Sequence, residues 1–178
     1  HQLKAATQES IAKTKAPRET TMIDNYTSRD ELWACTSCGA CMEACPLGIE
    51  HIPAIIDMRR YMTMTEGQMP SELQNTLEKL EAQANPWGFD NSTRADWAKG
   101  LNVPLLSEVK GSVEYLFWVG CAGSFDERYK KVSRSFAKIL NEAQVSYAIL
   151  GAEEKCNGDT ARRAGNEYLA QMQIEENR

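Results

Sequence analysis

Four of the six cysteines in this chain lie within eleven positions, and they limit the fold more than any other feature. Cys35, Cys38, Cys41 and Cys45 follow the spacing C-x2-C-x2-C-x3-C-P. This spacing is typical of a loop that wraps a [4Fe-4S] cube, with the first three thiolates close enough to bind three of its corners. Gly39 lets the backbone bend around inorganic sulfide. The sequence therefore predicts a [4Fe-4S] cluster with these four cysteines as its candidate metal ligands.

Cys45 has two possible roles. In two-cluster ferredoxins, the fourth cysteine of such a run binds the other cluster, so Cys45 belongs either to this cube or to a second one. A second cube needs another cysteine quartet, which this sequence does not contain. The chain also starts with His1 and stays polar over its first residues. We therefore expect it to be a piece of a larger protein.

Zinc and disulfide bonds are the alternative explanations for the cysteine run. Zinc sites usually pair two short hooks of ligands that lie a dozen or more residues apart, which does not match this spacing. A disulfide framework is typical of small secreted chains, but this sequence has no secretory signal. With 178 residues, 42% of them hydrophobic, it can bury a core without such bonds. We expect reduced thiols and a cytoplasmic location.

Charge and hydropathy argue against nucleic-acid binding and against a membrane span. The formal charge of −5 argues against nucleic acid, because phosphates need a basic surface. No apolar run approaches the roughly 20 residues that cross a bilayer, so we predict no membrane span in this chain. An acidic surface suits a protein partner.

The first part of the chain is predicted to be helical. Residues 1–27 form a polar segment, in which apolar spacing permits a short amphipathic helix over residues 1–13. A ferredoxin-type iron-sulfur region then covers residues 28–66. It opens with a capping box, in which Ser28 and Glu31 are three residues apart.

After the cysteine run, Pro53 is well placed in the first turn of another helix. We interpret Arg59 and Arg60 on this helix as solvated charges, and Trp33 as a packing residue. Residues 67–111 are predicted to be a helical connector.

The last part of the chain, residues 112–178, alternates strands and helices. Short β-branched and aromatic runs predict strands over residues 113–119 and 145–150, and Asp126 and Asp159 each begin a helix. Tandem strand-helix units imply parallel strands joined by a right-handed crossover. The inward positions of the first helix are predicted to be Tyr129, Val132, Phe136, Ile139 and Leu140. The fold class is therefore α+β, with a helical ferredoxin-like [4Fe-4S] domain followed by a small α/β cysteine-rich domain.

Cys121 and Cys156 are the remaining cysteines, and each follows one of the predicted strands. Loops at the carboxyl ends of parallel strands share one edge of the sheet, so the two thiols should meet there. Two cysteines can bind at most half of a cube. Either ligands from outside this chain complete a further cluster, or the two form a redox dithiol, or they are small buried hydrophobes.

Three motif blocks in the second half carry a family resemblance. They are residues 117–123 (FWVGCAG), 154–159 (EKCNGD) and 161–169 (ARRAGNEYL). With the cysteine run, they make the chain resemble iron-sulfur oxidoreductases that join a ferredoxin domain to CCG-type cysteine-rich domains. This family includes the cysteine-rich subunit of heterodisulfide reductase and the iron-sulfur subunits of glycolate oxidase and anaerobic glycerol-3-phosphate dehydrogenase. The strongest resemblance is to membrane-bound oxidoreductases that pass electrons from electron-transferring flavoprotein to quinone.

The resemblance implies an electron-transfer module with no catalytic residue of its own. Cys35, Cys38 and Cys41 would bind one cube with a fourth thiolate from outside this chain, and Cys45 would serve the other cube. The implied partners are a flavoprotein electron donor and a quinone-linked or membrane subunit at the cytoplasmic face. Whether the chain is itself an enzyme stays open. The alternatives are heterodisulfide reductase-like chemistry at Cys121 and Cys156, or a structural metal-bound docking module.

One position departs from the family pattern. Where heterodisulfide reductases carry adjacent cysteines, this chain has Cys156 followed by Asn157. An amide cannot replace a bridging thiolate, so the resemblance does not carry the non-cubane cluster of those enzymes over to this chain.

Overall fold

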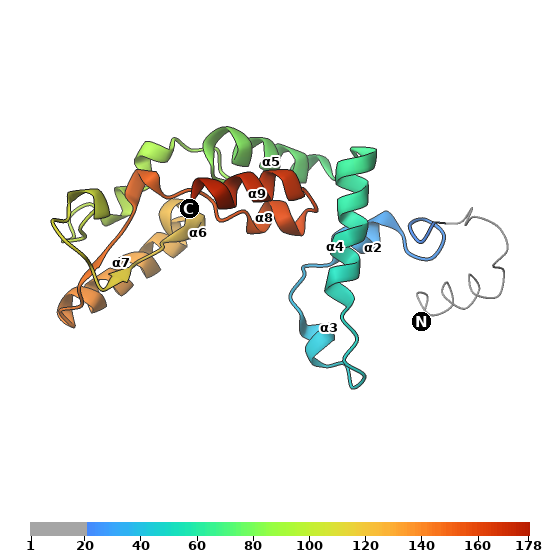
Figure 1. Cartoon of the computed structure of the whole chain (residues 1–178), viewed down its shortest axis with the longest axis horizontal. Coiled ribbons are helices and arrows are strands. Elements are labelled where there is room, and N and C mark those ends of the chain that lie inside the picture. The colour runs from blue at the N-terminus through green and yellow to red at the C-terminus, as the bar shows by residue number, and fades with distance from the viewer. Residues whose placement is uncertain (1–20) are drawn as a thin grey trace. The chain divides into compact units, whose positions relative to one another are not determined.

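The computed structural model describes residues 21–178, so the helix predicted over residues 1–13 lies outside the described residues. The chain divides into two compact units, one of residues His1–Pro70 with Arg163–Asn166, the other of Ser71–Arg162 with Glu167–Arg178. Over residues 21–178 most elements are helices, and the strands form a single two-stranded parallel sheet (Figure 1). This architecture confirms the predicted fold class.

From residue 21 to Pro70, the first unit contains three α-helices and one π-helical turn. They are α2 (Arg29–Ala34), α3 (Ala40–Glu43), α4 (His51–Tyr61) and η1 (Met62–Glu66), which continues α4. The predicted capping box opens α2, because the Ser28 hydroxyl accepts from the Glu31 amide and the Glu31 carboxylate accepts from the Ser28 amide. Ile23, Leu32 and Met62 form the core of this unit.

The structure contradicts the interpretation of Arg59 as a solvated charge. Its side chain lies in the last turn of α4 and is 5% exposed. The sequence suggested solvation because two adjacent arginines at a helix end usually face water. Here the helix turns only the second of them, Arg60, toward an exposed carboxylate, Asp57.

The second unit begins with α5 (Ser71–Gln83), whose Leu77 and Leu80 are buried. The Asn85 side chain closes the following turn, because its amide nitrogen donates to the carbonyls of Gln83 and Phe89 and its oxygen accepts from the Phe89 amide. The rest of the predicted helical connector contains only short 3-10 turns, which are η2 (Asn91–Thr93), η3 (Asp96–Ala98) and η4 (Leu106–Glu108).

The sheet of the second unit is parallel, as predicted, but short. Strand β1 (Tyr115–Leu116) pairs with β2 (Tyr147–Ala148), and one isolated bridge joins Leu105 to Ile149. The predicted strands of six or seven residues are thus reduced to two residues each. Both residues of β1 are exposed, whereas both residues of β2 are buried.

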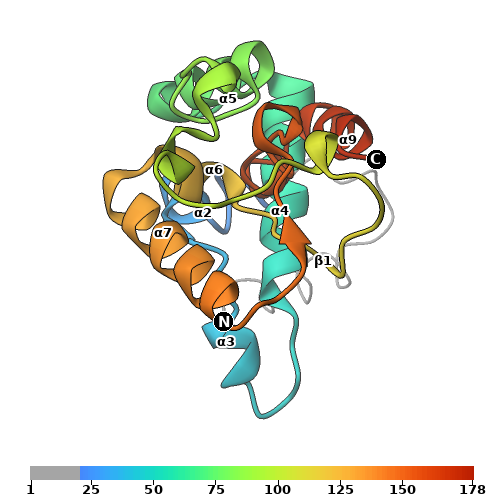
Figure 2. The ribbon, with the colours of Figure 1, turned by 90° about the vertical axis from the view of Figure 1, so that its left-hand side faces the viewer.

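Helix α6 (Gly120–Phe125) packs against α7 (Glu127–Glu142), and the two lie side by side in both views (Figures 1 and 2). Asp126 caps α7 as predicted, since its carboxylate accepts from two backbone amides of the first turn. Residues 120–123, which follow the first predicted strand, are the start of α6.

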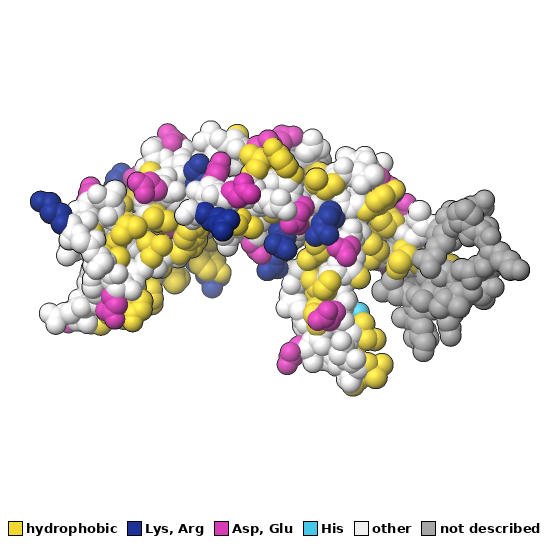
Figure 3. Space-filling model, viewed as in Figure 1, with side chains coloured by type: hydrophobic (Ala, Val, Ile, Leu, Met, Phe, Trp, Pro, Cys, Tyr) yellow, Lys and Arg dark blue, Asp and Glu magenta, His cyan; other side chains and the backbone are white. Residues whose placement is uncertain are grey.

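The predicted inward face of α7 was wrong at four of its five positions, and the fifth, Leu140, is half-buried. Tyr129, Val132, Phe136 and Ile139 are 45–62% exposed, while Ser133 and Ala137 are buried. The Ser133 hydroxyl donates to the Gly123 carbonyl at 3.1 Å, so α7 contacts α6 through its small residues. This contact turns the large apolar side chains outward, and hydrophobic side chains gather at the surface around α7 in Figure 3.

The chain ends with η5 (Gly151–Glu153), α8 (Asp159–Arg163) and α9 (Glu167–Glu176). The helix predicted to begin at Asp159 is divided into α8 and α9. Gly165 breaks it with a φ of +78°, and a Cβ at this position would overlap the backbone of α4 at Arg60. The close approach of two backbones therefore requires glycine here.

Candidate iron-sulfur site and buried cysteine pair

The predicted cluster loop joins α2 to α4 in the first unit. Cys35 ends α2, Cys41 lies in the short helix α3, and Gly39 precedes α3 with a φ of +80°. Cys38 and Cys41 are exposed, whereas Cys35 and Cys45 are half-buried. All four cysteines are free thiols.

Backbone amides point at the sulfur atoms of several of these cysteines. The Ser37 amide donates to Cys35 Sγ and the Ile49 amide donates to Cys45 Sγ, each at 3.4 Å. The hydrogen bond from Ile49 is the main reason that the pKa of Cys45 lies below its ordinary value. Such bonds favour the thiolate, which is the form that binds iron.

Cys38 is shifted in the same direction. The backbone amide of Ala40, followed by the Thr36 hydroxyl, lowers the pKa of Cys38. The Ser37 hydroxyl is buried and has no hydrogen-bond partner among the described residues. This hydroxyl could therefore donate a hydrogen bond to a cluster sulfur.

The donor set fits a [4Fe-4S] cube, since four free thiols and several amide donors lie on one loop. The loop is not closed around a metal position, however. Within residues 21–178, no three His, Cys, Asp or Glu side chains come together closely enough to hold a metal ion. The exposed thiols of Cys38 and Cys41 would have to turn toward the others. When bound, the cluster supplies one-electron transfer.

The structure brings Cys121 and Cys156 together, as expected for cysteines that follow parallel strands. Cys121 lies in the first turn of α6, and Cys156 lies in the loop before α8. Their thiols share a hydrogen bond without forming a disulfide. Cys156 is 5% exposed, and its backbone amide donates to the Ala84 carbonyl at 3.0 Å.

A buried ion pair beside Cys121 was missed by the sequence analysis. Arg94 and Glu154 are each 1% exposed, and Arg94 Nη2 lies 2.8 Å from Glu154 Oε1. The same guanidinium nitrogen lies 3.4 Å from Cys121 Sγ. The carboxylate of Glu154 also accepts hydrogen bonds from the backbone amides of Val119 and Gly120, at 3.0 and 2.8 Å. The pair thus holds both the cysteine and the backbone that carries it.

These contacts shift the pKa values of the two thiols in opposite directions. The hydrogen bond from Cys156, followed by the charge and hydrogen bond of Arg94, lowers the pKa of Cys121 to about 6, although burial opposes the shift. The same hydrogen bond, together with burial, raises the pKa of Cys156. These contacts therefore favour ionisation of Cys121 over ionisation of Cys156.

Only one residue of this ion pair could be recognised from the sequence. Glu154 lies in a motif block that carried the family resemblance, directly before Lys155 and Cys156. Arg94 lies in the connector, 60 residues earlier, where no pattern distinguishes it from other arginines. Its role depends on a contact that the chain makes only after folding.

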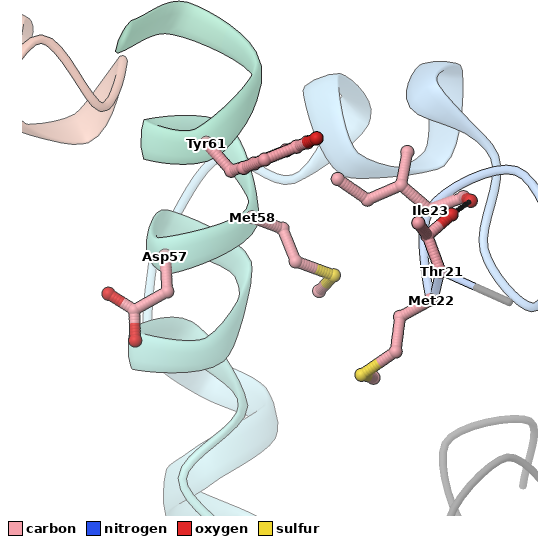
Figure 4. A pocket seen from close by; sticks show the side chains of 6 residues that line it. All are labelled: Thr21, Met22, Ile23, Asp57, Met58 and Tyr61. Atoms are coloured by element: carbon pink, nitrogen blue, oxygen red, sulfur yellow. Dashed lines mark hydrogen bonds between the residues drawn. The ribbon is translucent and has the colours of Figure 1, made fainter. Parts of the chain in front are cut away.

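A further cavity, of about 320 Å³, lies in the first unit between α4 and the segment before α2. Apolar side chains of Met22, Met58 and Tyr61 line it (Figure 4). Its one carboxylate, Asp57, is ion-paired with Arg60 at 2.6 Å. None of the helices in the described part of the chain is both long and apolar enough to span a membrane.

Comparison with known proteins identifies two domains. Residues 2–49 match a 4Fe-4S dicluster domain, and residues 115–178 match a cysteine-rich domain. The chain is 46% identical over 162 residues to a probable iron-sulfur-binding oxidoreductase of Bacillus subtilis, covering 88% of this chain and 23% of that protein. It is 45% identical over 177 residues to the EtfAB:quinone oxidoreductase of Syntrophomonas wolfei, covering 97% of this chain and 25% of that protein.

A more distant relative is a subunit of the dihydromethanophenazine:CoB–CoM heterodisulfide reductase of Methanosarcina barkeri. It is 27% identical over 161 residues, which cover 89% of this chain and 37% of that protein. No solved structure matches this chain. The chain spans about a quarter of the length of the first two relatives. These matches confirm the predicted resemblance: the chain contains a 4Fe-4S dicluster domain followed by a cysteine-rich domain, and its homologues are iron-sulfur oxidoreductases.

Proposed function

We propose that this chain is the iron-sulfur electron-transfer segment of a larger oxidoreductase. The observation that carries the proposal is the loop of four free thiols, three of which accept backbone amide hydrogen bonds. The relatives at 45–46% identity are named as iron-sulfur or quinone oxidoreductases, which agrees with this role. The cluster would take up and release single electrons.

Within this role, Cys35, Cys38 and Cys41 bind one cube, and Cys45 binds either this cube or a second one. The protein contributes thiolate ligands and amide donors, which stabilise negative charge on sulfur and so help to set the reduction potential. No side chain has to transfer a proton for an electron to pass.

The proposed electron donor is a flavoprotein, and the proposed acceptor is a quinone-linked or membrane partner. Both follow from the EtfAB:quinone oxidoreductase of Syntrophomonas wolfei, whose name gives the two sides of such a relay. The proposed location is the cytoplasmic face of a membrane, where a water-exposed flavoprotein can meet a quinone-linked subunit.

Thiol-disulfide chemistry at Cys121 and Cys156 is less favoured. Cys156 is almost completely buried, which leaves little room for a disulfide substrate to reach it. The relative that is named for such chemistry is 27% identical, against 45–46% for the other two.

The test is spectroscopy on the intact protein, purified without oxygen. We expect iron and sulfide in cluster stoichiometry, and an electron paramagnetic resonance (EPR) signal that appears on reduction with dithionite. Cys38→Ser should remove the signal of the cube on this loop, because an exposed ligand with a stabilised thiolate is lost. Cys121→Ser is the matched control and should keep that signal. Stoichiometric zinc in place of iron, with no EPR signal, would refute the proposal.

A further inference from the structure

Arg59 is a buried cation that reaches the start of the cluster loop. Its Nε donates to the Leu32 carbonyl at 3.0 Å, and its Nη2 donates to the carbonyls of Leu32 and Cys35. Its Nη1 donates to the Arg163 carbonyl at 3.0 Å. The guanidinium therefore fixes the end of α2, where the first cysteine of the loop begins, to the last turn of α4.

No carboxylate balances this charge in the part of the chain that the structure describes. The partners of Arg59 are neutral carbonyl groups and the ring of Trp33, whose centroid lies 5.1 Å from the guanidinium carbon. Arg94, the other deeply buried arginine, has Glu154 at 2.8 Å. Burying a guanidinium without an opposite charge is unfavourable, because carbonyl dipoles and an aromatic face replace only part of its hydration.

A bound cluster would supply the opposite charge. A [4Fe-4S] cube with four thiolates carries a net negative charge, and each electron it accepts makes that charge more negative. A fixed cation held in a poorly hydrated position beside such a group stabilises the reduced form more than the oxidised form. Arg59 is already held against the Cys35 backbone, so no rearrangement of its side chain is needed.

We propose that Arg59 is the fixed counter-charge of the [4Fe-4S] cluster on the Cys35–Cys45 loop and that it makes this cluster easier to reduce. The inference rests on the cluster site put forward under the proposed function. Arg59 is a positioning residue, because it acts on the cluster through its charge and through the Cys35 carbonyl and is not itself a ligand.

The experiment is potentiometric titration of the EPR signal in the intact protein, purified without oxygen with its clusters in place. Arg59→Gln removes the charge and keeps an amide donor. Arg59→Lys keeps the charge and loses the planar guanidinium with its several N–H donors. Arg60→Gln, on the neighbouring residue that pairs with the exposed Asp57, is the matched control.

We expect Arg59→Gln to lower the equilibrium constant for reduction at least tenfold, which is 59 mV for a one-electron couple. Arg59→Lys and Arg60→Gln should each stay within threefold of the unchanged protein. If Arg59 had a purely structural role, the lysine and glutamine variants would instead show the same shift in midpoint potential.

Two results would overturn the inference. One is an Arg59→Gln variant whose midpoint stays within threefold of the unchanged protein. The other is an Arg59→Lys variant that shifts tenfold or more, which decides the question even if the glutamine variant fails to keep its cluster. Absence of a cluster from the unchanged protein is a separate outcome, because it refutes the proposed function and the inference together.

Discussion

The contact between Cys121 and Cys156 predicts a cysteine that ionises far below the usual range. With a pKa of about 6 in place of 9.0, Cys121 is about nine-tenths ionised at pH 7, against about 1% for the ordinary thiol. A lowered pKa means that the thiolate persists to lower pH. Alkylation of Cys121, which requires the thiolate, should therefore rise through about pH 6 and level off by about pH 7.

The midpoint of this profile is more informative than the rate at one pH. Nucleophilicity falls with pKa, with a Brønsted coefficient of about 0.4–0.5, so a drop of three pKa units makes the thiolate about 16 to 30 times less reactive. At pH 7 this loss offsets most of the gain in ionisation and leaves an advantage of only about three- to sixfold. Half-burial of Cys121 slows the reaction further without moving the midpoint.

The assay is iodoacetamide labelling from pH 4.5 to pH 9.5, with the peptide that contains Cys121 quantified by mass spectrometry. Cys156→Ala removes the largest cause of the shift and leaves burial, so the midpoint should move up by more than about one pH unit. Arg94→Gln should also raise the midpoint, since the charge and the hydrogen bond of the guanidinium are both lost. Arg128→Gln, on the exposed side of α7, is the control.

Two results would refute this reasoning. The first is a midpoint above pH 8 in the unchanged protein, because the thiolate would then lack the support that its surroundings provide. The second is a Cys156→Ala variant with an unchanged midpoint, because the hydrogen bond between the two thiols would then contribute nothing.

Two further predictions concern stability, measured as the free energy of unfolding in urea. Glu154→Gln leaves the buried Arg94 without its charged partner, so the free energy of unfolding should fall by about 3–5 kcal/mol. Asp57→Asn, in an exposed ion pair, should change the free energy of unfolding little. Equal effects of the two substitutions would contradict the burial of the Arg94–Glu154 pair. Gly165→Ala should cost more than Gly100→Ala, because both have a φ of +78° but only Gly165 lacks room for a Cβ. Similar losses would show that backbone strain alone requires glycine at 165.

Features that depend on neighbouring residues could be predicted from the sequence. The capping box of Ser28 and Glu31 and the cap at Asp126 both formed, because a side chain that satisfies a backbone amide two or three residues away needs no distant partner. The meeting of Cys121 and Cys156 was also predictable, since it follows from parallel strand order rather than from side-chain packing.

The orientation of α7 could not be predicted in the same way. Its spacing of apolar residues correctly indicated a helix, and the large side chains were assigned to the core by default. The contact of Ser133 with Gly123 decided the orientation instead, because small residues let two helices approach closely. Hydrophobic periodicity identifies the helix, but the surface of the neighbouring helix determines which face is buried.

The buried arginines show why charges near the cysteines were the hardest features to predict. In sequence, Arg59 and Arg94 look like any exposed arginine, and burial becomes favourable only when folding brings several acceptors to one guanidinium. The two sites then differ in what the sulfur experiences. Arg94 is largely neutralised by Glu154, so the hydrogen bond from Cys156 dominates at Cys121. Among residues 21–178, Arg59 has no carboxylate partner, so the larger electrostatic effect is expected at the iron-sulfur loop beside Cys35.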